Sequence, residues 1–163
     1  MSDLLPKRIN PWLLYRHHEV LQGTVALVDM PNLLASQLRK KGHADVSLSV
    51  VRREDGQIVL TGQADVALTF ACQRCLQPLE HTFAVPFELV LVKYDSQLES
   101  VNDEDDAIVC EESLLLAPLI EQELILALPM IVKHDSCKAM YEYTETDEAK
   151  HQRPFANLKD LLS

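Results

Sequence analysis

Glycine is scarce in this chain: only four of its 163 residues are glycine. Loops that cradle phosphate groups need several closely spaced glycines, because the backbone must approach the ligand directly. The sequence has no such loop, and it has neither a serine-centred nucleophile elbow nor a His-Glu-x-x-His motif. We therefore expect a protein that is not an enzyme and that has no small-molecule substrate.

Aromatic residues and long apolar runs are also scarce. Aromatic residues make up 6% of the chain and are scattered, so no strand interleaves aromatic and basic side chains as a base-stacking surface does. The longest uncharged apolar stretch covers residues 124–132 and contains Pro129, whereas about 20 apolar residues are needed to span a membrane. The first residues lack the apolar core of a signal peptide. We expect a cytoplasmic protein that does not bind membranes.

The four cysteines are too few and too unevenly spaced for a disulfide framework, and cytoplasmic thiols stay reduced. Cys72 and Cys75 form a Cys-x-x-Cys step, and His134 and Cys137 repeat its spacing about sixty residues later. Two thiolates on one turn can share a metal ion, and soft thiolates with an imidazole suit a closed tetrahedral zinc site. We predict that these four residues bind a structural Zn²⁺.

Two other interpretations of the cysteines remain. The first is a pair of reduced thiols on a turn, with His134 and Cys137 on the surface. The second is a redox-active pair, which is disfavoured because the flanking residues have the pattern of strands rather than of a strand-to-helix junction. Cys110 lies in an apolar segment and is expected to be an inert buried thiol.

Glu121 and Glu123 are the candidate pair of catalytic carboxylates. They are two positions apart in a helical pattern, so their side chains do not face the same way. General acid–base catalysis requires both groups at one substrate. We therefore expect both glutamates on a solvated face of the helix.

The net charge of −10 is unevenly distributed along the chain. Residues 1–75 carry nine Lys/Arg and seven Asp/Glu, whereas residues 76–163 carry six and eighteen. An acidic half repels phosphate backbones, so any contact with nucleic acid is expected in the N-terminal half. The candidate RNA-binding residues are Lys7, Arg8, Arg39, Lys40, Lys41, Arg52, Arg53 and Arg74. Alternatively, these are solvated loop ends and helix termini.

The first part of the chain mixes helix and strand signals. Asn10 followed by Pro11 predicts a capped helix over residues 11–17. Residues 21–30 alternate loosely and predict a strand. Pro31 begins a second helical pattern, which runs to a basic end and a stop at Gly42.

Two hairpins follow. Apolar and polar residues alternate over residues 46–50, and Asp55-Gly56 supplies a turn. In the return strand over residues 58–70, every second residue belongs to one face, and Cys72 continues that face. Residues 83–91 alternate again, and Pro86 suggests that this strand lies at a sheet edge or contains a bulge.

Residues 96–106 form an acidic stretch without periodicity, and we expect a mobile loop there. Beyond it, a helical pattern begins at about Ser113. Pro118 is tolerated only in the first turn of a helix, so we expect the helix to start late in this pattern and to end by Pro129. Residues 140–163 are a polar tail with a short helix expected over residues 155–162. We predict one α+β domain over residues 1–163: a bent antiparallel sheet or partial barrel of about five or six strands with two or three helices.

The order of the motifs along the chain resembles the YceD family of bacterial proteins, also called DUF177. The motifs are Cys72-Gln73-Arg74-Cys75-Leu76-x-Pro78, residues 121–129 (EQELILALP), His134-Asp135 and residues 154–159 (PFANLK). The resemblance implies a role in accumulation of the 23S rRNA of the large subunit, through its synthesis, processing or stability. Many relatives carry a cysteine pair in place of His134 and Cys137, which supports the four-residue zinc set.

Two modes of action are expected for a non-enzymatic ribosome-biogenesis factor of this kind. In one, the basic residues contact the large-subunit rRNA precursor, and salt weakens binding steeply. In the other, the acidic half holds a basic ribosomal protein or assembly factor. The candidate residues for the second mode are Asp103, Glu104, Asp105 and Asp106. The alternative function is a zinc-stabilised adaptor for an RNA-processing enzyme, which does not itself touch RNA.

Overall fold

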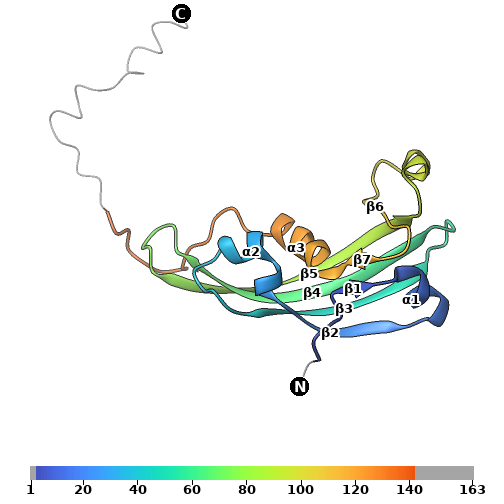
Figure 1. The fold of residues 1–163 in the computed structure, drawn as a ribbon. Helices are drawn as coiled ribbons and strands as arrows, with labels where there is room; N and C mark the ends of the chain where they lie inside the picture. The colour runs from blue at the N-terminus through green and yellow to red at the C-terminus, as the bar shows by residue number, and fades with distance from the viewer. Residues whose placement is uncertain (1–2, 142–163) are drawn as a thin grey trace, which may run out of the picture.

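A five-stranded sheet with the order β2-β3-β4-β5-β6 forms the body of the structure (Figure 1). The structure is a computed structural model and describes residues 3–141. The predicted helix at residues 155–162 lies outside this range. The strands of the sheet are β2 (Val20–Ala26), β3 (His43–Arg52), β4 (Ile58–Ala71), β5 (Pro78–Val92) and β6 (Ala107–Val109). The order is open, so a closed barrel is not formed, and the prediction of a single α+β domain is confirmed.

The helices and a small second sheet complete the domain. Strands β1 (Arg8–Ile9) and β7 (Leu114–Leu115) pair antiparallel beside the main sheet. The helical elements are α1 (Pro11–His17), the 3₁₀ turn η1 (Leu27–Asp29), α2 (Pro31–Ala35), the 3₁₀ helix η2 (Asp95–Ser100) and α3 (Leu116–Leu126). Helices α2 and α3 lie side by side over one face of the sheet (Figure 1). Within residues 3–141, no helix has both the length and the apolar character needed to cross a membrane.

Local sequence signals account for the ends of these helices. The Asn10 side chain accepts a hydrogen bond from the Leu13 N–H (3.0 Å), and Pro11 takes the first helical position, as predicted for α1. Pro118 stands in the first turn of α3, which starts late for that reason.

The second helix, α2, is shorter than predicted. It ends at Ala35 because Leu38 leaves the helix and donates its N–H to the Thr69 carbonyl of β4 (2.7 Å).

The long hairpin of β4 and β5 is the backbone of the sheet. It pairs without interruption from Val59↔Val90 to Ala71↔Pro78. Pro86 is tolerated because β6 pairs only with Val90–Val92, which leaves β5 at a sheet edge beside the proline, as predicted. The β5–β6 pair is parallel, so the sheet is mixed, with three antiparallel pairs and one parallel pair. The chain between the two strands crosses back over their length, and β6 therefore runs in the same direction as β5.

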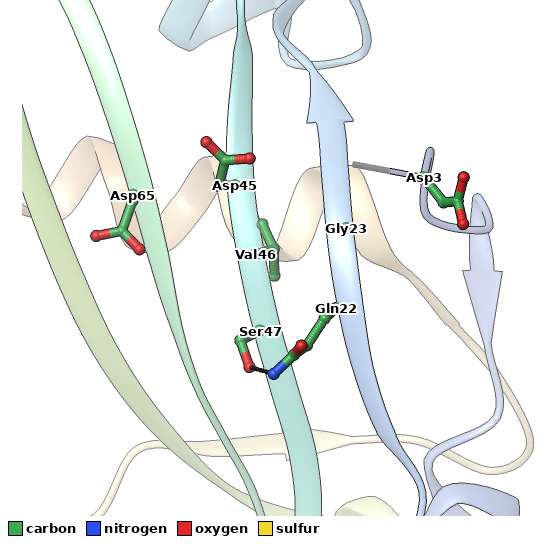
Figure 2. A pocket seen from close by; sticks show the side chains of 7 residues that line it. All are labelled: Asp3, Gln22, Gly23, Asp45, Val46, Ser47 and Asp65. Carbon is green, nitrogen blue, oxygen red and sulfur yellow. Dashed lines mark hydrogen bonds between the residues drawn. The ribbon is translucent and has the colours of Figure 1, made fainter. Parts of the chain in front are cut away.

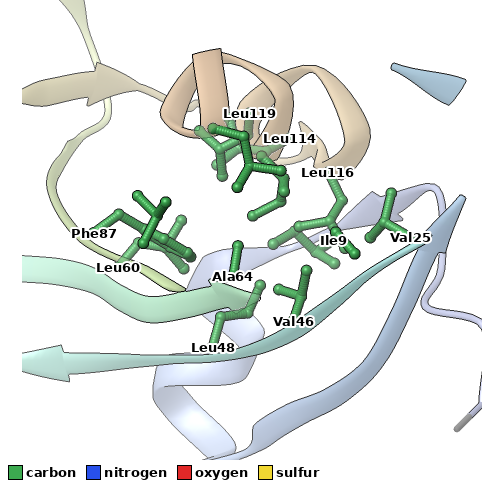
Figure 3. Close-up of a cluster of buried hydrophobic side chains, with 14 of the residues drawn as sticks. Ile9, Val25, Val46, Leu48, Leu60, Ala64, Phe87, Leu114, Leu116 and Leu119 are labelled. Carbon is green, nitrogen blue, oxygen red and sulfur yellow. The ribbon is translucent and has the colours of Figure 1, made fainter. Parts of the chain in front are cut away.

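The hydrophobic core lies between the sheet and α3. Figure 3 shows Val46, Leu48, Leu60 and Ala64 of the sheet facing Leu119 of the helix. Gly62 is required in this layer, because a Cβ there would lie 2.4 Å from the Ser47 carbonyl oxygen and 2.6 Å from the Phe87 ring. The missing side chain leaves room for that ring over the middle of the sheet.

The opposite face of β2, β3 and β4 is polar and is not covered by the described helices. Figure 2 shows a shallow hollow there, lined by side chains that include Asp3, Asp45 and Asp65. Asp45 and Asp65 stand opposite each other in the strand register, where like charges repel. The hollow brings carboxylates together, and its lining residues include no histidine, cysteine or lysine.

The acidic stretch contains a 3₁₀ helix and an ion pair. Residues 95–100 form η2, and Asp105 accepts two hydrogen bonds from the Arg53 guanidinium (2.9 and 2.7 Å). Arg53 also contacts Asp55 and Glu88, so one cation ties the β3–β4 turn to β5 and to the chain before β6. The sequence predicted a mobile loop over residues 96–106, and its mobility stays a prediction.

The Arg53 cluster predicts a specific dependence of stability on acid. Hydrogen bonds from Arg53 hold the pKa of the Asp105 and Asp55 carboxyls below their ordinary value of 3.8. Stability from a depressed carboxyl pKa is present above the unfolded value and is lost as the pH falls through the folded value. We expect Asp105→Asn to lower the Tm at about pH 7 and to narrow the Tm difference between about pH 7 and about pH 2.5. Thermal unfolding monitored by circular dichroism measures this, with the exposed Asp103→Asn as control; an unchanged difference would contradict it.

Candidate metal centre

The turn that joins β4 to β5 supplies the first half of the site. Cys72 follows directly on β4 and is fully buried. The turn is closed by the N–H of Leu76, which donates to the Cys72 carbonyl, and by the N–H of Cys72, which donates to the Gln77 carbonyl (2.9 Å each). Leu76 has a φ of 60°, the left-handed conformation in which glycine is favoured. The turn thus forms without the glycine that commonly shapes a cysteine turn.

The chain after α3 supplies the second half. It runs back along the turn, where the Gln73 N–H donates to the Val132 carbonyl (2.8 Å) and the Gln73 side chain donates to the Met130 carbonyl (3.0 Å). Beyond the second half-site, the Met140 N–H donates to the Arg74 carbonyl (3.1 Å). These contacts hold the segment on both sides of His134 and Cys137 against the cysteine turn.

The four predicted ligands come together as the sequence spacing indicated. Their ligand atoms all lie within 4.8 Å of one another. The Sγ atoms of Cys72 and Cys137 are 3.7 Å apart, and Cys75 Sγ is 3.3 Å from Nδ1 of His134. Sulfur and nitrogen ligands at about 2.0–2.3 Å from a tetrahedral ion lie roughly 3.5–3.8 Å from each other. The geometry and the soft donors therefore fit a metal ion held by all four residues.

The environment of the sulfurs favours at least one thiolate. Burial raises the pKa of the Cys72 thiol, but backbone N–H groups of Cys75, His134 and Arg74 outweigh it and lower the pKa to about 5. At Cys75, a backbone hydrogen bond from Gln77 lowers the pKa, but burial and the neighbouring sulfurs of Cys72 and Cys137 raise it overall. The cluster thus disfavours a second thiolate beside the first, and a bound cation would favour it.

Arg74 is the main counter-charge within the protein. Its Nε donates to Cys137 Sγ (2.9 Å), and its Nη2 donates to the carbonyls of both His134 and Asp135. The contact with Cys137 raises the pKa of the guanidinium. Three thiolates, one imidazole and a divalent ion carry a net charge of about −1, which this single guanidinium balances. Arg74 is therefore expected to be a positioning residue of the candidate metal centre, while its contact with RNA stays a prediction.

Removal of the Arg74 charge should weaken metal binding without removing a ligand. We expect Arg74→Met to lower the affinity for Zn²⁺ by about 10- to 100-fold, the usual effect of losing a group that orients ligands. Competition with a chromophoric chelator measures this. The Zn²⁺ affinity of Arg74→Lys should lie between those of the wild type and Arg74→Met, because lysine keeps the charge and loses the forked donor geometry. An affinity of Arg74→Met equal to that of the wild type would contradict this role.

The other predicted basic residues do not form one surface. Residues 39–41 precede β3, and residues 52–53 lie at its other end. The two groups are therefore separated by the length of a ten-residue strand, roughly 30 Å. Lys7 lies 3.5 Å from Asp29, and Arg8 donates to Ser113 (3.1 Å). Of the acidic candidates, Asp105 pairs with Arg53, while Asp103, Glu104 and Asp106 are exposed.

Glu121 has a role that the sequence pattern did not predict. It is buried, and its carboxylate accepts hydrogen bonds from the N–H groups of Asn32 (2.6 Å) and Leu33 (3.0 Å) at the start of α2. The expectation of a solvated Glu121 was wrong because α2 packs its N-terminus against α3. Glu123 is half-buried, and Cys110 is buried as predicted.

The fold and the site define a small α+β protein with a Cys₃His centre that joins one end of its sheet to the chain after α3. The chain belongs to the YceD family: the family model described as "Large ribosomal RNA subunit accumulation protein YceD" matches residues 60–162. That range contains both halves of the candidate metal centre.

The large ribosomal RNA subunit accumulation protein YceD of Haemophilus influenzae is 27% identical over 148 residues, which cover 85% of each of the two chains. No solved structure matches this chain significantly.

Proposed function

We propose that this protein is a non-catalytic ribosome-biogenesis factor that supports accumulation of 23S rRNA in the cytoplasm. The supporting observation is the family match over residues 60–162, since the family description refers to accumulation of the large ribosomal RNA. The proposed mode of action is binding, either to the large-subunit rRNA precursor or to a basic ribosomal protein or assembly factor. Processing, synthesis and stability of 23S rRNA are the steps that such binding could support.

We further propose that the metal is a structural Zn²⁺. Three thiolates and one imidazole fill the tetrahedral shell, so no position is left for a reacting water or substrate. The residues Cys72 and Cys75 would hold the β4–β5 turn, and His134 and Cys137 would hold the chain after α3. The ion would stabilise a part of the protein that has few buried apolar residues of its own.

An exposed apolar surface favours a second candidate function, that of a protein adaptor. Leu126 ends α3, Met130 and Ile131 lie between α3 and the metal centre, and the three are 76%, 93% and 67% exposed. Apolar side chains gathered on a surface are typical of protein-binding sites. In this role the protein would recruit an RNA-processing enzyme without itself touching RNA.

Deletion of the gene tests the proposed function. We expect a lower ratio of 23S to 16S rRNA in the deletion strain, restored by the wild-type gene, with capillary electrophoresis of total RNA as the readout. A tagged protein should retain large-subunit precursors before, and lose them after, treatment with ribonuclease. A deletion strain with a normal ratio would contradict the proposal, and one enzyme retained after ribonuclease treatment would establish the adaptor instead.

A further inference from the structure

We propose that the end of the sheet at the β4–β5 turn, where the candidate metal centre lies, is the rRNA-binding surface of this protein. We call it the metal end, and we propose that the metal centre assembles its surface. This inference rests on the proposed function and names the partner's chemistry, the phosphate backbone of RNA. The surface consists of five exposed cations from two segments far apart in the sequence: Arg39, Lys40, Lys41, Lys133 and Lys138.

Backbone hydrogen bonds and one ion pair between side chains bring these two segments to the same end of the sheet. The first segment is anchored by Leu38, which donates to Thr69 of β4, and by Arg39, which lies 3.2 Å from Glu80 of β5. The second is anchored by Val132, which accepts from Gln73 of the cysteine turn. Thr69 and Gln73 are four residues apart on one chain, so at most about 13 Å separate them. Figure 1 shows both segments beside the β4–β5 turn.

The charge of the described chain is divided between its two ends. Around the metal centre, residues 36–43, 69–81 and 128–141 contain six Lys/Arg and two Asp/Glu. Residues 93–112 contain one Lys/Arg and eight Asp/Glu, and Figure 1 places them at the opposite end, around η2 and β6. A polyanion is attracted to the first end and repelled by the second, which orients the protein on RNA despite its net charge of −10.

The metal centre determines whether the cations act together. Lys133 precedes the ligand His134, and Lys138 follows the ligand Cys137, so both lysines are placed by the ligands next to them. Arg39, Lys40 and Lys41 do not depend on the ion, because β4 and β5 hold their loop. Loss of the metal would therefore detach two of the five cations. Arg74 is excluded from the set because it is half-buried against Cys137, whereas the Arg39 side chain, although it pairs with Glu80, is 67% exposed.

The chemistry of the surface points to the RNA backbone rather than to bases. The five residues are lysines and an arginine, which bind phosphate oxygens, and the sequence lacks an aromatic strand for base stacking. Binding should be tolerant of sequence and strongly dependent on salt. Each phosphate contact on a single strand contributes about −0.7 to the slope of log K against log salt concentration.

Two paired charge reversals and a matched control test this surface. The test variants are Lys40→Glu/Lys41→Glu and Lys133→Glu/Lys138→Glu, and the control is Arg16→Glu/Lys93→Glu, which makes the same change in net charge away from the metal end. The probes are a 30-nucleotide single-stranded RNA of mixed sequence, the corresponding duplex and a 23S rRNA transcript. Fluorescence anisotropy or filter binding gives Kd over a range of salt concentrations. Metal content and Tm of each variant show that the fold is kept.

We expect each test variant to weaken binding of the single strand at least about tenfold and to reduce its salt slope by about 1.4, while the control changes Kd by less than about twofold. Removal of the metal from the wild type by a chelator should reduce the slope as the Lys133/Lys138 variant does. Chelation should then have no further effect on that variant. The single strand and the duplex together show which form of RNA the surface prefers.

Equal effects of the control and the test variants would overturn the inference, as would binding that chelation leaves unchanged. Retention of a basic ribosomal protein through the acidic end, with no RNA binding, would also overturn it. Complementation separates this failure from failure of the proposed function. If the test variants restore the 23S rRNA of the deletion strain, the surface is wrong and the function stands; if the deletion strain has normal 23S rRNA, the function itself is wrong.

Discussion

Replacement of Cys72 by serine should abolish metal binding and release the chain after α3 from the β4–β5 turn. Cys72 is the buried ligand of the set, and its sulfur contacts both Cys137 Sγ (3.7 Å) and the His134 N–H (3.4 Å). A serine hydroxyl cannot replace a thiolate for a soft metal. We expect the affinity for Zn²⁺ to fall more than about 100-fold, beyond the effect of losing a group that only orients the ligands.

The change should remain local. The main core lies between the sheet and α3, whereas the segment over residues 129–141 contains one buried side chain, Val132. Far-UV circular dichroism should therefore be close to that of the wild type, while amide hydrogen exchange over residues 129–141 should become fast. Native mass spectrometry measures the metal. Cys110→Ala removes a buried thiol outside the set and should keep one bound metal ion. Full metal content in Cys72→Ser would refute the four-ligand centre.

Loss of the Glu121 carboxylate should destabilise the whole domain. Its oxygens accept from two N–H groups at the positive end of α2 and from the Asn32 side chain (3.3 Å), and the residue is 7% exposed. In Glu121→Gln the charge is lost, and one oxygen is replaced by an NH₂ group that faces donors. We expect a loss of about 2–3 kcal/mol in the free energy of unfolding, because hydrogen bonds to a charged acceptor are strong and the N–H groups are left unpaired.

Glu123→Gln is the matched control for this prediction. It makes the same chemical change two residues away on α3, where burial and then repulsion from Asp106 raise the pKa of the carboxyl. A raised carboxyl pKa means that the charged form is disfavoured by the fold, so neutralisation should be neutral or slightly stabilising at pH 7. Urea unfolding gives both free energies, and Glu121→Gln should also lower the Tm by roughly 5–10 °C. Similar stabilities of the two variants would contradict the capping role.

The local structure of this protein was largely predictable because it depends on neighbouring residues. The Asn10 cap, the late start of α3 at Pro118 and the edge position of Pro86 each follow from the backbone chemistry of one or two residues. The length of α2 was mispredicted, and the pairing of the acidic stretch was not foreseen. In both, a distant partner decided the conformation: Thr69 ends the helical segment at Leu38, and Arg53 fixes Asp105.

The candidate metal centre was predictable for a different reason. The spacing of Cys72 with Cys75 and of His134 with Cys137 carries the ligand chemistry in the sequence itself. The roles of Arg74 and Glu121 were not predictable from spacing. A charged side chain reads as a surface residue in the sequence, and only the packed structure shows that a thiolate or a helix N-terminus lies within hydrogen-bonding distance.

The sequence by itself determined the periodicity of the hairpins, the ligand types of the metal centre and the family. It also determined the excess of acid in the second half of the chain. Only the tertiary structure decided that the chain before residues 39–41 and the chain before Lys133, which belongs to that acidic half, are both hydrogen-bonded near the β4–β5 turn, at Thr69 and at Gln73. The physical reason is that charge acts through space, whereas a sequence orders charges only along the chain.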